Sequence, residues 1–297
     1  MAYSLPSRID KVQFEGRALY VKRDDLIDSC FSGNKYRKLY TLLNTPSSHY
    51  TKIISYGGTQ SNAMLAIACL CHVKGWEFHY YSKCLPEYLK EGTEGNLEKS
   101  LHKQMHLHEV PHELFQKKVK ELQEYKEDKT LLISQGAADE LALEGVHGLA
   151  DEITAWKDEN KMVKLSVVLP SGTGTTALYL RSSLPEEIAV YTSVLVGDAA
   201  YQKEQWKRLS SGPFPHIFVS EEKRRFAKPY DEYLQMYQEL LRSTDIEFDL
   251  IYAPKTWLEM LAYLKDDEGE ILYIHTGGTS GNKTMLERYR YKNSKRR

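Results

Sequence analysis

The sequence has no excess of charge of either sign and no long run of apolar residues. Its 40 Lys+Arg against 41 Asp+Glu give a formal net charge of −1, which does not favour nucleic acid as the main partner. The longest uninterrupted apolar run, residues 63–71, is far shorter than the roughly 18 residues that a membrane-spanning helix needs. The opening residues MAYSLPSRID lack the charged head and apolar stretch of a secretory signal. We therefore expect neither export nor membrane insertion.

Cysteine is also scarce. The four cysteines, Cys30, Cys69, Cys71 and Cys84, form no CxxC pair and have no zinc-type spacing. Isolated cysteines in a chain of this length are typical of reduced thiols in an intracellular protein. We therefore expect free thiols in a cytoplasmic protein, with Cys69 and Cys71 in the core.

The composition that remains is that of a globular α/β protein. The 297 residues are 41 % hydrophobic and 27 % charged, which suits one large domain or two modest ones. Short apolar runs alternate with longer amphipathic ones, a pattern typical of α/β folds. The clearest helix is expected at residues 34–43, where apolar side chains repeat at helical spacing. Strands are expected at residues 18–22, 52–55, 77–81, 131–134, 165–169, 188–194, 216–219, 248–251 and 271–274.

Two polar stretches lie outside this pattern. We expect the chain to pass between lobes at residues 157–161. Residues 288–297 hold six basic residues and no acidic one. This composition favours a solvated tail over a contact with a phosphate-rich partner.

Three segments place a Gly/Ser/Thr turn directly after an apolar, strand-like run, at residues 53–65, 167–180 and 272–282. In open α/β sheets, ligands bind outside the carboxyl ends of strands, where such turns lie. The turn at residues 171–176, SGTGTT, offers backbone N–H groups at the start of a helix, which can bind phosphate. It matches neither the Walker P-loop nor the GxGxxG fingerprint. Taken alone, it fits a tight turn without a ligand equally well.

Polar side chains follow the glycines of the first turn, at residues 59–62. They could present donors to a ligand, although an ordinary Ser/Asn helix cap explains them as well. A further candidate is the segment SGNKYRK, in which Lys35 and Lys38 lie one turn apart near a helix start. Cations there oppose the helix dipole, and an anionic ligand would offset this. A lysine beside another cation also loses its proton more easily, as Schiff-base chemistry requires.

Four histidines, His102, His106, His108 and His112, fall within eleven residues. Histidines four apart on a helix can share a metal ion. This stretch is expected to change from helix to strand, however, and no Asp or Cys joins it at ligand spacing. We therefore expect exposed histidines and no metal site.

Taken together, five segments resemble the family of D-cysteine desulfhydrases and 1-aminocyclopropane-1-carboxylate (ACC) deaminases, which depend on pyridoxal 5'-phosphate (PLP). The segments are KRDDL at 22–26, GNKYRKL at 33–39, GGTQSN at 57–62, GTGTT at 172–176 and HTGG at 275–278. Their order and spacing extend over almost the whole chain, which makes a chance match improbable.

The resemblance implies the α/β architecture of fold-type II PLP enzymes, similar to the tryptophan synthase β subunit. Such enzymes have two lobes, each with a twisted open sheet flanked by helices. A large cofactor-binding lobe would comprise residues 1–47 and 157–297, and a small lobe residues 48–156. The resemblance also implies a homodimer.

The resemblance further implies the roles of individual residues. Lys35 would bind PLP through its amine and move the Cα proton of the substrate, and Lys38 would hold the phosphate. Tyr252 would lie against the pyridine ring. The catalytic residues would be Lys35, Ser61, Tyr252 and Tyr230, and the substrate-binding residues Gln60, Ser61 and Asn62. The cofactor-binding residues would be Lys35, Lys38, Asn62, Gly172, Thr173, Gly174, Thr175, Thr176, Tyr252 and Thr276.

The implied activity is that of a deaminating lyase acting on a small amino acid, with PLP as electron sink. D-cysteine would give pyruvate, ammonia and sulfide, whereas ACC would give 2-oxobutanoate and ammonia. Ala253 stands where ACC deaminases carry Glu and desulfhydrases Thr, and Thr276 could take that place. Residues 136–139, GAAD, replace the usual Gly-Gly-Ser-Asn type turn. The missing Glu counts against ACC deaminase, which stays an alternative to the desulfhydrase. Ala253 and the altered turn together motivate a second alternative, a divergent PLP-binding protein with little turnover.

Overall fold

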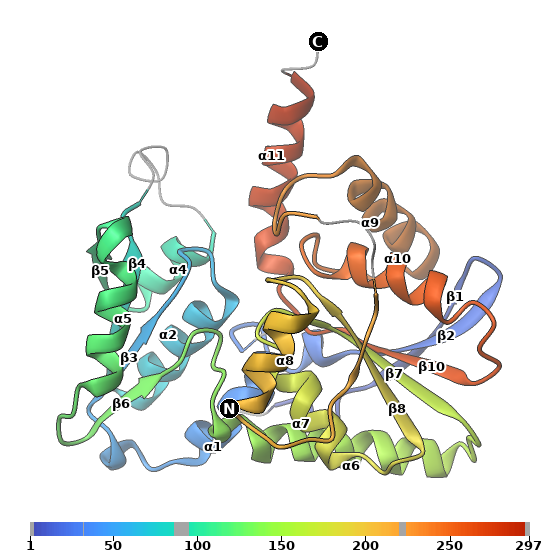
Figure 1. The fold of residues 1–297 in the computed structure, drawn as a ribbon, viewed down its shortest axis with the longest axis horizontal. Helices are drawn as coiled ribbons and strands as arrows, with labels where there is room; N and C mark the ends of the chain where they lie inside the picture. The colour runs from blue at the N-terminus through green and yellow to red at the C-terminus, as the bar shows by residue number, and fades with distance from the viewer. Residues whose placement is uncertain (1–2, 32, 86–94, 220–223, 295–297) are drawn as a thin grey trace.

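The computed structural model describes residues 3–31, 33–85, 95–219 and 224–294. It contains two sheets, one of four and one of six strands, which lie in two lobes side by side (Figure 1). The strand order is β5-β4-β3-β6 in the small sheet and β1-β2-β10-β7-β8-β9 in the large one. Neighbouring strands are parallel throughout, except for the antiparallel pair β1 and β2.

The small sheet comprises β3 (Lys52–Tyr56), β4 (Glu77–Lys83), β5 (His106–Val110) and β6 (Thr130–Ile133). The large sheet comprises β1 (Ile9–Phe14), β2 (Arg17–Lys22), β7 (Leu165–Ser171), β8 (Ile188–Val194), β9 (His216–Ile217) and β10 (Glu270–Ile274). The helices are α1 (Asn34–Asn44), α2 (Asn62–Lys74), α4 (Asn96–His102), α5 (Phe115–Glu124), α6 (Leu143–Glu159), α7 (Thr175–Ser183), α8 (Ala199–Lys207), α9 (Asp231–Thr244), α10 (Ala253–Tyr263) and α11 (Asn282–Ser294).

Helices cover both faces of the large sheet, and this explains why its inner strand β7 is mostly apolar. All of β7 is buried. Leu165, Val167 and Leu169 pack with α6 and α7 on one face, and Val168 packs with α9 and α10 on the other. A strand buried on both faces reads as a continuous apolar run. Figure 1 shows α6 and α7 below this sheet and α9 and α10 above it.

The small sheet is built in the same way. Ile53 of β3 faces a core that includes α1, α2 and α4, whereas the next residue, Ile54, packs with Phe115 and Leu122 of α5. The apolar run at residues 63–71 is buried throughout α2. None of the described helices combines the length and apolarity needed to cross a membrane.

Eight of the nine expected strands are observed, with boundaries shifted by a few residues at most. The strand expected at residues 248–251 is wrong. The chain turns there instead, because Asp249 Oδ1 accepts hydrogen bonds from the backbone N–H groups of Ile251 and Tyr252. β1 and β5 were not expected, since both carry many polar residues.

The expectation of free thiols is also wrong for two cysteines. Cys30 and Cys69 form a disulfide with their Cα atoms 6.1 Å apart, a usual separation for such a bond. Cys71 and Cys84 are free, and Cys71 is buried as expected. The pair is separated by 39 residues, so its proximity depends on tertiary structure that no local pattern indicates.

The lobe boundary at residues 156/157 stays a prediction. The helix α6 spans this boundary, and its buried residues pack with the large sheet.

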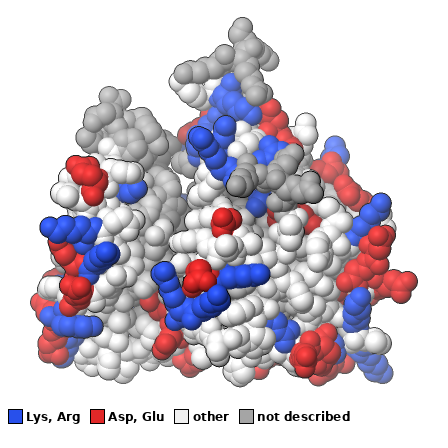
Figure 2. Space-filling model, viewed as in Figure 1, with Lys and Arg blue, Asp and Glu red and all other residues white. Residues whose placement is uncertain are grey.

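The basic tail continues α11 as far as Ser294, and residues 295–297 lie outside the described part of the chain. On the face in Figure 2, Lys and Arg alternate with Asp and Glu, as the net charge of −1 suggests.

The clustered histidines are distributed over α4, β5 and a short turn at His112–Leu114. His106 and His108 stack against His79 of β4. In the described ranges, no group of three or more His, Cys, Asp or Glu residues could hold a metal ion.

Candidate active site

Three glycine-rich turns, after β3, β7 and β10, line one cavity of about 2090 Å³. They occupy the carboxyl ends of parallel strands, where α/β proteins bind ligands. The expected site residues that line the cavity are Lys35, Lys38, Gln60, Ser61, Asn62, Gly172, Thr173, Gly174, Thr175, Thr176, Tyr252 and Thr276. Tyr230 is not among the described lining residues, and its hydroxyl accepts a hydrogen bond from the backbone N of Arg225 at 3.0 Å.

Lys35 lies in the first turn of α1 and lines the cavity. Its Nζ donates to Asn34 Oδ1 at 2.7 Å, and Asn34 Nδ2 donates to Thr176 Oγ1 at 3.2 Å. Loss of contact with water lowers the pKa of Lys35 to about 8, although the negative charge of Asp249 acts in the opposite direction. A substantial fraction of Lys35 is therefore neutral near physiological pH, as attack on a carbonyl group requires.

The turn after β10 fixes the start of α1. Gly33 has a φ of +60°, and a Cβ atom there would lie 2.0 Å from the carbonyl oxygen of Thr276. The backbone N of Asn34 donates to the same oxygen at 3.2 Å. Only glycine allows this close approach, so the HTGG turn holds Lys35 in place through Gly33.

Lys38 is a buried cation on the same side of α1. It is 4 % exposed, and its Nζ donates to the Gly136 carbonyl at 3.0 Å and to Thr173 Oγ1 at 3.2 Å. Burial lowers the pKa of Lys38, and the neighbouring charge of Lys35 lowers it further. Lys38 forms no ion pair with any residue in the described ranges. The carboxylate of Asp139 raises the pKa of Lys38, in opposition to burial, but it is not within ion-pair distance in the described structure. This buried amine therefore lacks the close counterion that buried charges normally have.

Two residues of α8 fix the turn after β7, and sequence reasoning missed both. Gly174 has a φ of +73°, and a Cβ atom there would lie 2.1 Å from Gln202 Nε2. Gln202 donates to the Thr173 carbonyl at 2.9 Å, and Trp206 Nε1 donates to the Gly174 carbonyl at 3.0 Å. These two hydrogen bonds hold the turn against α8, and the N-terminus of α7 lines the cavity beside Lys38.

The turn after β3 serves both as a cap and as cavity wall. Ser61 Oγ accepts from the backbone N of Met64 at 3.3 Å and so caps α2. Behind the turn, the buried Tyr80 hydroxyl donates to the Gly58 carbonyl at 3.0 Å. Gln60 Oε1 accepts from the backbone N of Asn96 at 2.9 Å. The capping and ligand-binding interpretations of this segment are therefore compatible.

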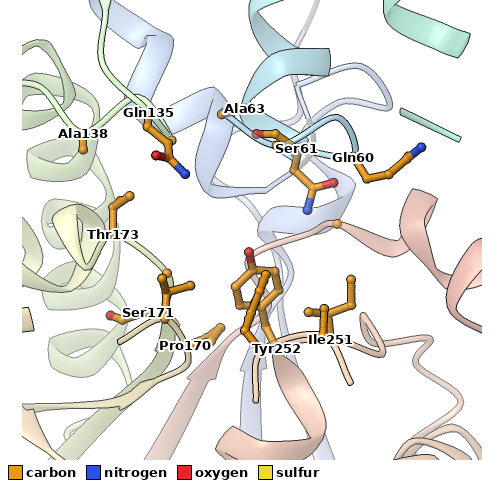
Figure 3. Close-up of a pocket in the computed structure, with 18 of the residues that line it drawn as sticks. Gln60, Ser61, Ala63, Gln135, Ala138, Pro170, Ser171, Thr173, Ile251 and Tyr252 are labelled. Atoms are coloured by element: carbon orange, nitrogen blue, oxygen red, sulfur yellow. The ribbon is translucent and has the colours of Figure 1, made fainter. Parts of the chain in front are cut away.

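Tyr252 rises into the cavity between the first and second turns (Figure 3). A Cβ atom on Gly172 would lie 3.6 Å from the ring of Tyr252, so this ring lies close to the turn after β7. Asp249, which sequence reasoning missed, lines the same cavity and is 3 % exposed. Burial raises the pKa of Asp249 to about 6, although hydrogen bonds from the backbone N–H groups of Tyr252 and its neighbours act in the opposite direction.

Ala253 does not belong to the cavity. It is fully buried in the core formed with α9, α10 and the large sheet, whereas Thr276 lines the cavity. The side chain of Ala253 therefore contributes to the packing of α10. Thr276 remains the candidate for a polar group beside the ligand.

The missed residues Asn34 and Asn96 do have a weak sequence signal. Each follows a glycine directly and begins a helix, α1 and α4 respectively. Asp249 has none, because its segment reads as a buried strand. No pattern connects Gln202 or Trp206 with the turn that they support.

Comparison with known proteins relates the whole chain to two named activities. A Thermotoga maritima protein with the provisional name 1-aminocyclopropane-1-carboxylate deaminase is 26 % identical over 288 residues, covering 90 % of this chain and 90 % of the relative. An Arabidopsis thaliana protein named bifunctional D-cysteine desulfhydrase/1-aminocyclopropane-1-carboxylate deaminase is 25 % identical over 90 % of this chain and 73 % of its own length.

No protein-family model matches the chain. Among solved structures, that of an ACC deaminase homologue superimposes with a TM-score of 0.76 at 22 % identity, covering 97 % of this chain and 95 % of the other. The expected fold-type II architecture is thus confirmed. The chain is a homologue of proteins named for ACC deamination and D-cysteine desulfhydration, as its five motifs indicate.

Proposed function

We propose that the protein is a PLP-dependent deaminating lyase that acts on a small amino acid, in the manner of a D-cysteine desulfhydrase. The observation that carries this proposal is the convergence of Lys35 and Lys38 with three glycine-rich turns in one cavity. The names of the two relatives supply the two candidate substrates, D-cysteine and ACC.

The residues present fit PLP on chemical grounds. Lys38 is buried without a carboxylate at ion-pair distance in the described structure, next to the N-terminus of α7. A phosphate would supply the missing negative charge there. Lys35 offers an amine with a lowered pKa for a carbonyl carbon, and Tyr252 offers a ring face. Residues 172–176, Asn62 and Thr276 would complete the binding site.

When bound, PLP supplies an electron sink that stabilises negative charge on the α-carbon of the substrate. Lys35 Nζ would take the α-proton, for which its lowered pKa is suited. Gln60, Ser61 and Asn62 would orient the substrate carboxylate. Overall, D-cysteine and water would give pyruvate, ammonia and hydrogen sulfide. The catalytic role expected for Tyr230 stays a prediction, since the residue lies outside the described cavity lining.

Two alternatives remain in the same cavity. ACC and water would give 2-oxobutanoate and ammonia, and the names of both relatives support this reaction. The second alternative is a PLP-binding protein with little turnover. The Gly136–Asp139 segment favours it, because the small Ala138 and the exposed Gln135 beside this segment form the cavity wall (Figure 3).

An assay of the PLP-loaded protein separates these reactions. We expect pyruvate and sulfide from D-cysteine, little 2-oxobutanoate from ACC, and no product from the Lys35→Ala variant. Production of 2-oxobutanoate alone would favour ACC deaminase. If neither product forms faster than with free PLP, both activities are excluded.

We also propose that the protein acts in the cytoplasm and that it forms a homodimer, the latter as the resemblance implies. Light scattering of the purified protein tests the dimer against the 34.3 kDa chain mass. Cell fractionation tests the compartment, where a disulfide such as Cys30–Cys69 would be uncommon.

A further inference from the structure

The side chain of Asn96 connects the first glycine-rich turn with the opposite lobe. Asn96 is the first residue of α4 and is 1 % exposed. Its Nδ2 donates to Asn62 Oδ1 at 2.8 Å and to the Gln60 carbonyl at 3.1 Å. Its Oδ1 accepts from Ser280 Oγ at 2.8 Å. Both amide donors and the carbonyl oxygen are therefore engaged, each with a different residue.

These three partners belong to two different parts of the fold. Gln60 lies in the turn after β3 and Asn62 begins α2, both beside the small sheet, whereas Ser280 lies in the short helix Thr279–Gly281 that follows β10 of the large sheet. The backbone of Asn96 adds a fourth contact, because its N–H donates to Gln60 Oε1 at 2.9 Å. One buried amide thus joins two of the three cavity turns.

The contact with Asn96 also determines which way the amide of Asn62 faces. Because Asn62 Oδ1 accepts from Asn96, its Nδ2 points the other way, where a Cβ atom on Gly278 would lie 2.7 Å from it. Asn62 and Gly278 both line the cavity. The donor of Asn62 is therefore directed toward the HTGG turn.

We propose that Asn96 is a positioning residue, which holds the donor of Asn62 at the HTGG edge of the cavity where the ligand would bind, and ties the Gln60–Asn62 segment to the large lobe through Ser280. This role deepens the proposed function and rests on it, since the ligand in question is PLP with its amino-acid substrate. Asn96 does not itself line the cavity in the described structure, so it acts through Gln60 and Asn62.

The test compares Asn96→Asp and Ser280→Ala with a matched control, Ser100→Ala. The aspartate keeps the shape of Asn96 but removes both donors, while Ser280→Ala removes only the bond between the lobes. Ser100 is equally buried, and its Oγ donates to the backbone carbonyl of Asn96 at 2.7 Å. The control variant therefore disturbs α4 and leaves the side-chain bonds of Asn96 intact.

We expect Asn96→Asp to lower kcat/KM at least tenfold and to weaken PLP binding, measured by absorbance titration. Ser280→Ala should raise KM several-fold with a smaller change in kcat. Ser100→Ala should lower Tm to a similar extent, with kcat/KM within twofold of the original protein. Equal kcat/KM for Asn96→Asp and Ser100→Ala would overturn the proposal.

Hydrogen exchange of the cofactor-free protein gives a readout that does not depend on activity. Amides of residues 58–62 should exchange at least tenfold faster in Asn96→Asp than in Ser100→Ala. Unchanged exchange would overturn the positioning role. If the original protein neither binds PLP nor turns over an amino acid, the proposed function fails, and this exchange measurement still decides whether Asn96 orders the turn.

Discussion

Lys35 and Lys38 lie one helical turn apart on α1, and their surroundings give them different properties. Lys35 lines the cavity, and burial lowers its pKa to about 8 although the negative charge of Asp249 raises it. Lys38 is more deeply buried and donates to uncharged oxygens of Gly136 and Thr173. The sequence placed both near a helix start, but it could not show which amine faces the cavity, because this depends on turns far away in the chain.

Chemical labelling of the cofactor-free protein tests the lowered pKa of Lys35. Neutral amines react with acetic anhydride, so labelling of Lys35 should be half-maximal near pH 8, whereas a free lysine derivative in the same mixture titrates near its ordinary pKa of about 10.4. Asp249→Asn removes the charge that raises this pKa, so its midpoint should lie below that of the original protein. A midpoint near 10 in the original protein would contradict this assignment.

Lys38→Met should raise the stability of the cofactor-free protein while it weakens phosphate binding. A buried cation without a close counterion opposes folding, and replacement by an apolar side chain of similar length should stabilise by about 1 kcal/mol, or about 2 °C in Tm. Calorimetry of the cofactor-free protein and a PLP titration measure the two effects. A lower Tm together with unchanged PLP affinity would contradict the account.

At the scale of elements, the motifs divide into ligand-facing and structural residues. In KRDDL and GNKYRKL, Lys22, Asp24 and Arg37 are buried and form a charge network with Glu152 of α6. Although burial favours the protonated form, Arg37 and Lys22 keep the pKa of Asp24 below its usual value. This network attaches α1, which carries Lys35, to the large lobe.

Arg37→Ala should lower the free energy of unfolding by about 3–5 kcal/mol, because it leaves a buried carboxylate without its partner. The exposed pair of Arg8 with Asp10 provides the control, since Arg8→Ala at the surface should cost at most about 1 kcal/mol. Urea denaturation of both variants measures the difference. Equal destabilisation would show that the network does not hold α1.

The disulfide links the segment before α1 to α2, the two elements that carry Lys35 and Asn62. For cysteines 39 residues apart, loop-closure entropy predicts a contribution of about 4 kcal/mol. Cys30→Ala should lower the free energy of unfolding by about this amount, whereas Cys84→Ala, at an exposed free thiol, should have little effect. Alkylation of all four cysteines in unfolded, unreduced protein would contradict the bond.

The sequence predicted elements better than it predicted their connections. Apolar strands such as β7 and β8 could be read from composition because burial on both faces leaves a continuous apolar run. Strand β5, with three polar residues among five, could not. The turn at Asp249 depends on a side-chain cap, and the disulfide on a contact between distant segments, so neither has a local signal.

At the scale of the whole molecule, the site forms only when distant segments of the chain come together in the folded structure. Turns separated by more than a hundred residues meet in one cavity because their strands end at matching edges of two sheets. The resemblance to a known family named twelve of the residues that line this cavity, and Tyr230 lies outside its described lining. It could not locate the supporting residues Asn96, Gln202 and Trp206, which contact the turns only in three dimensions.

Whether Lys35 anchors PLP can be measured directly on the purified protein. Its visible absorbance is recorded, the protein is reduced with borohydride, and the modified peptide is mapped. The account predicts a yellow protein with the pyridoxyl group fixed on Lys35. A protein that stays colourless after PLP is added, or a pyridoxyl group fixed on another lysine, would contradict it.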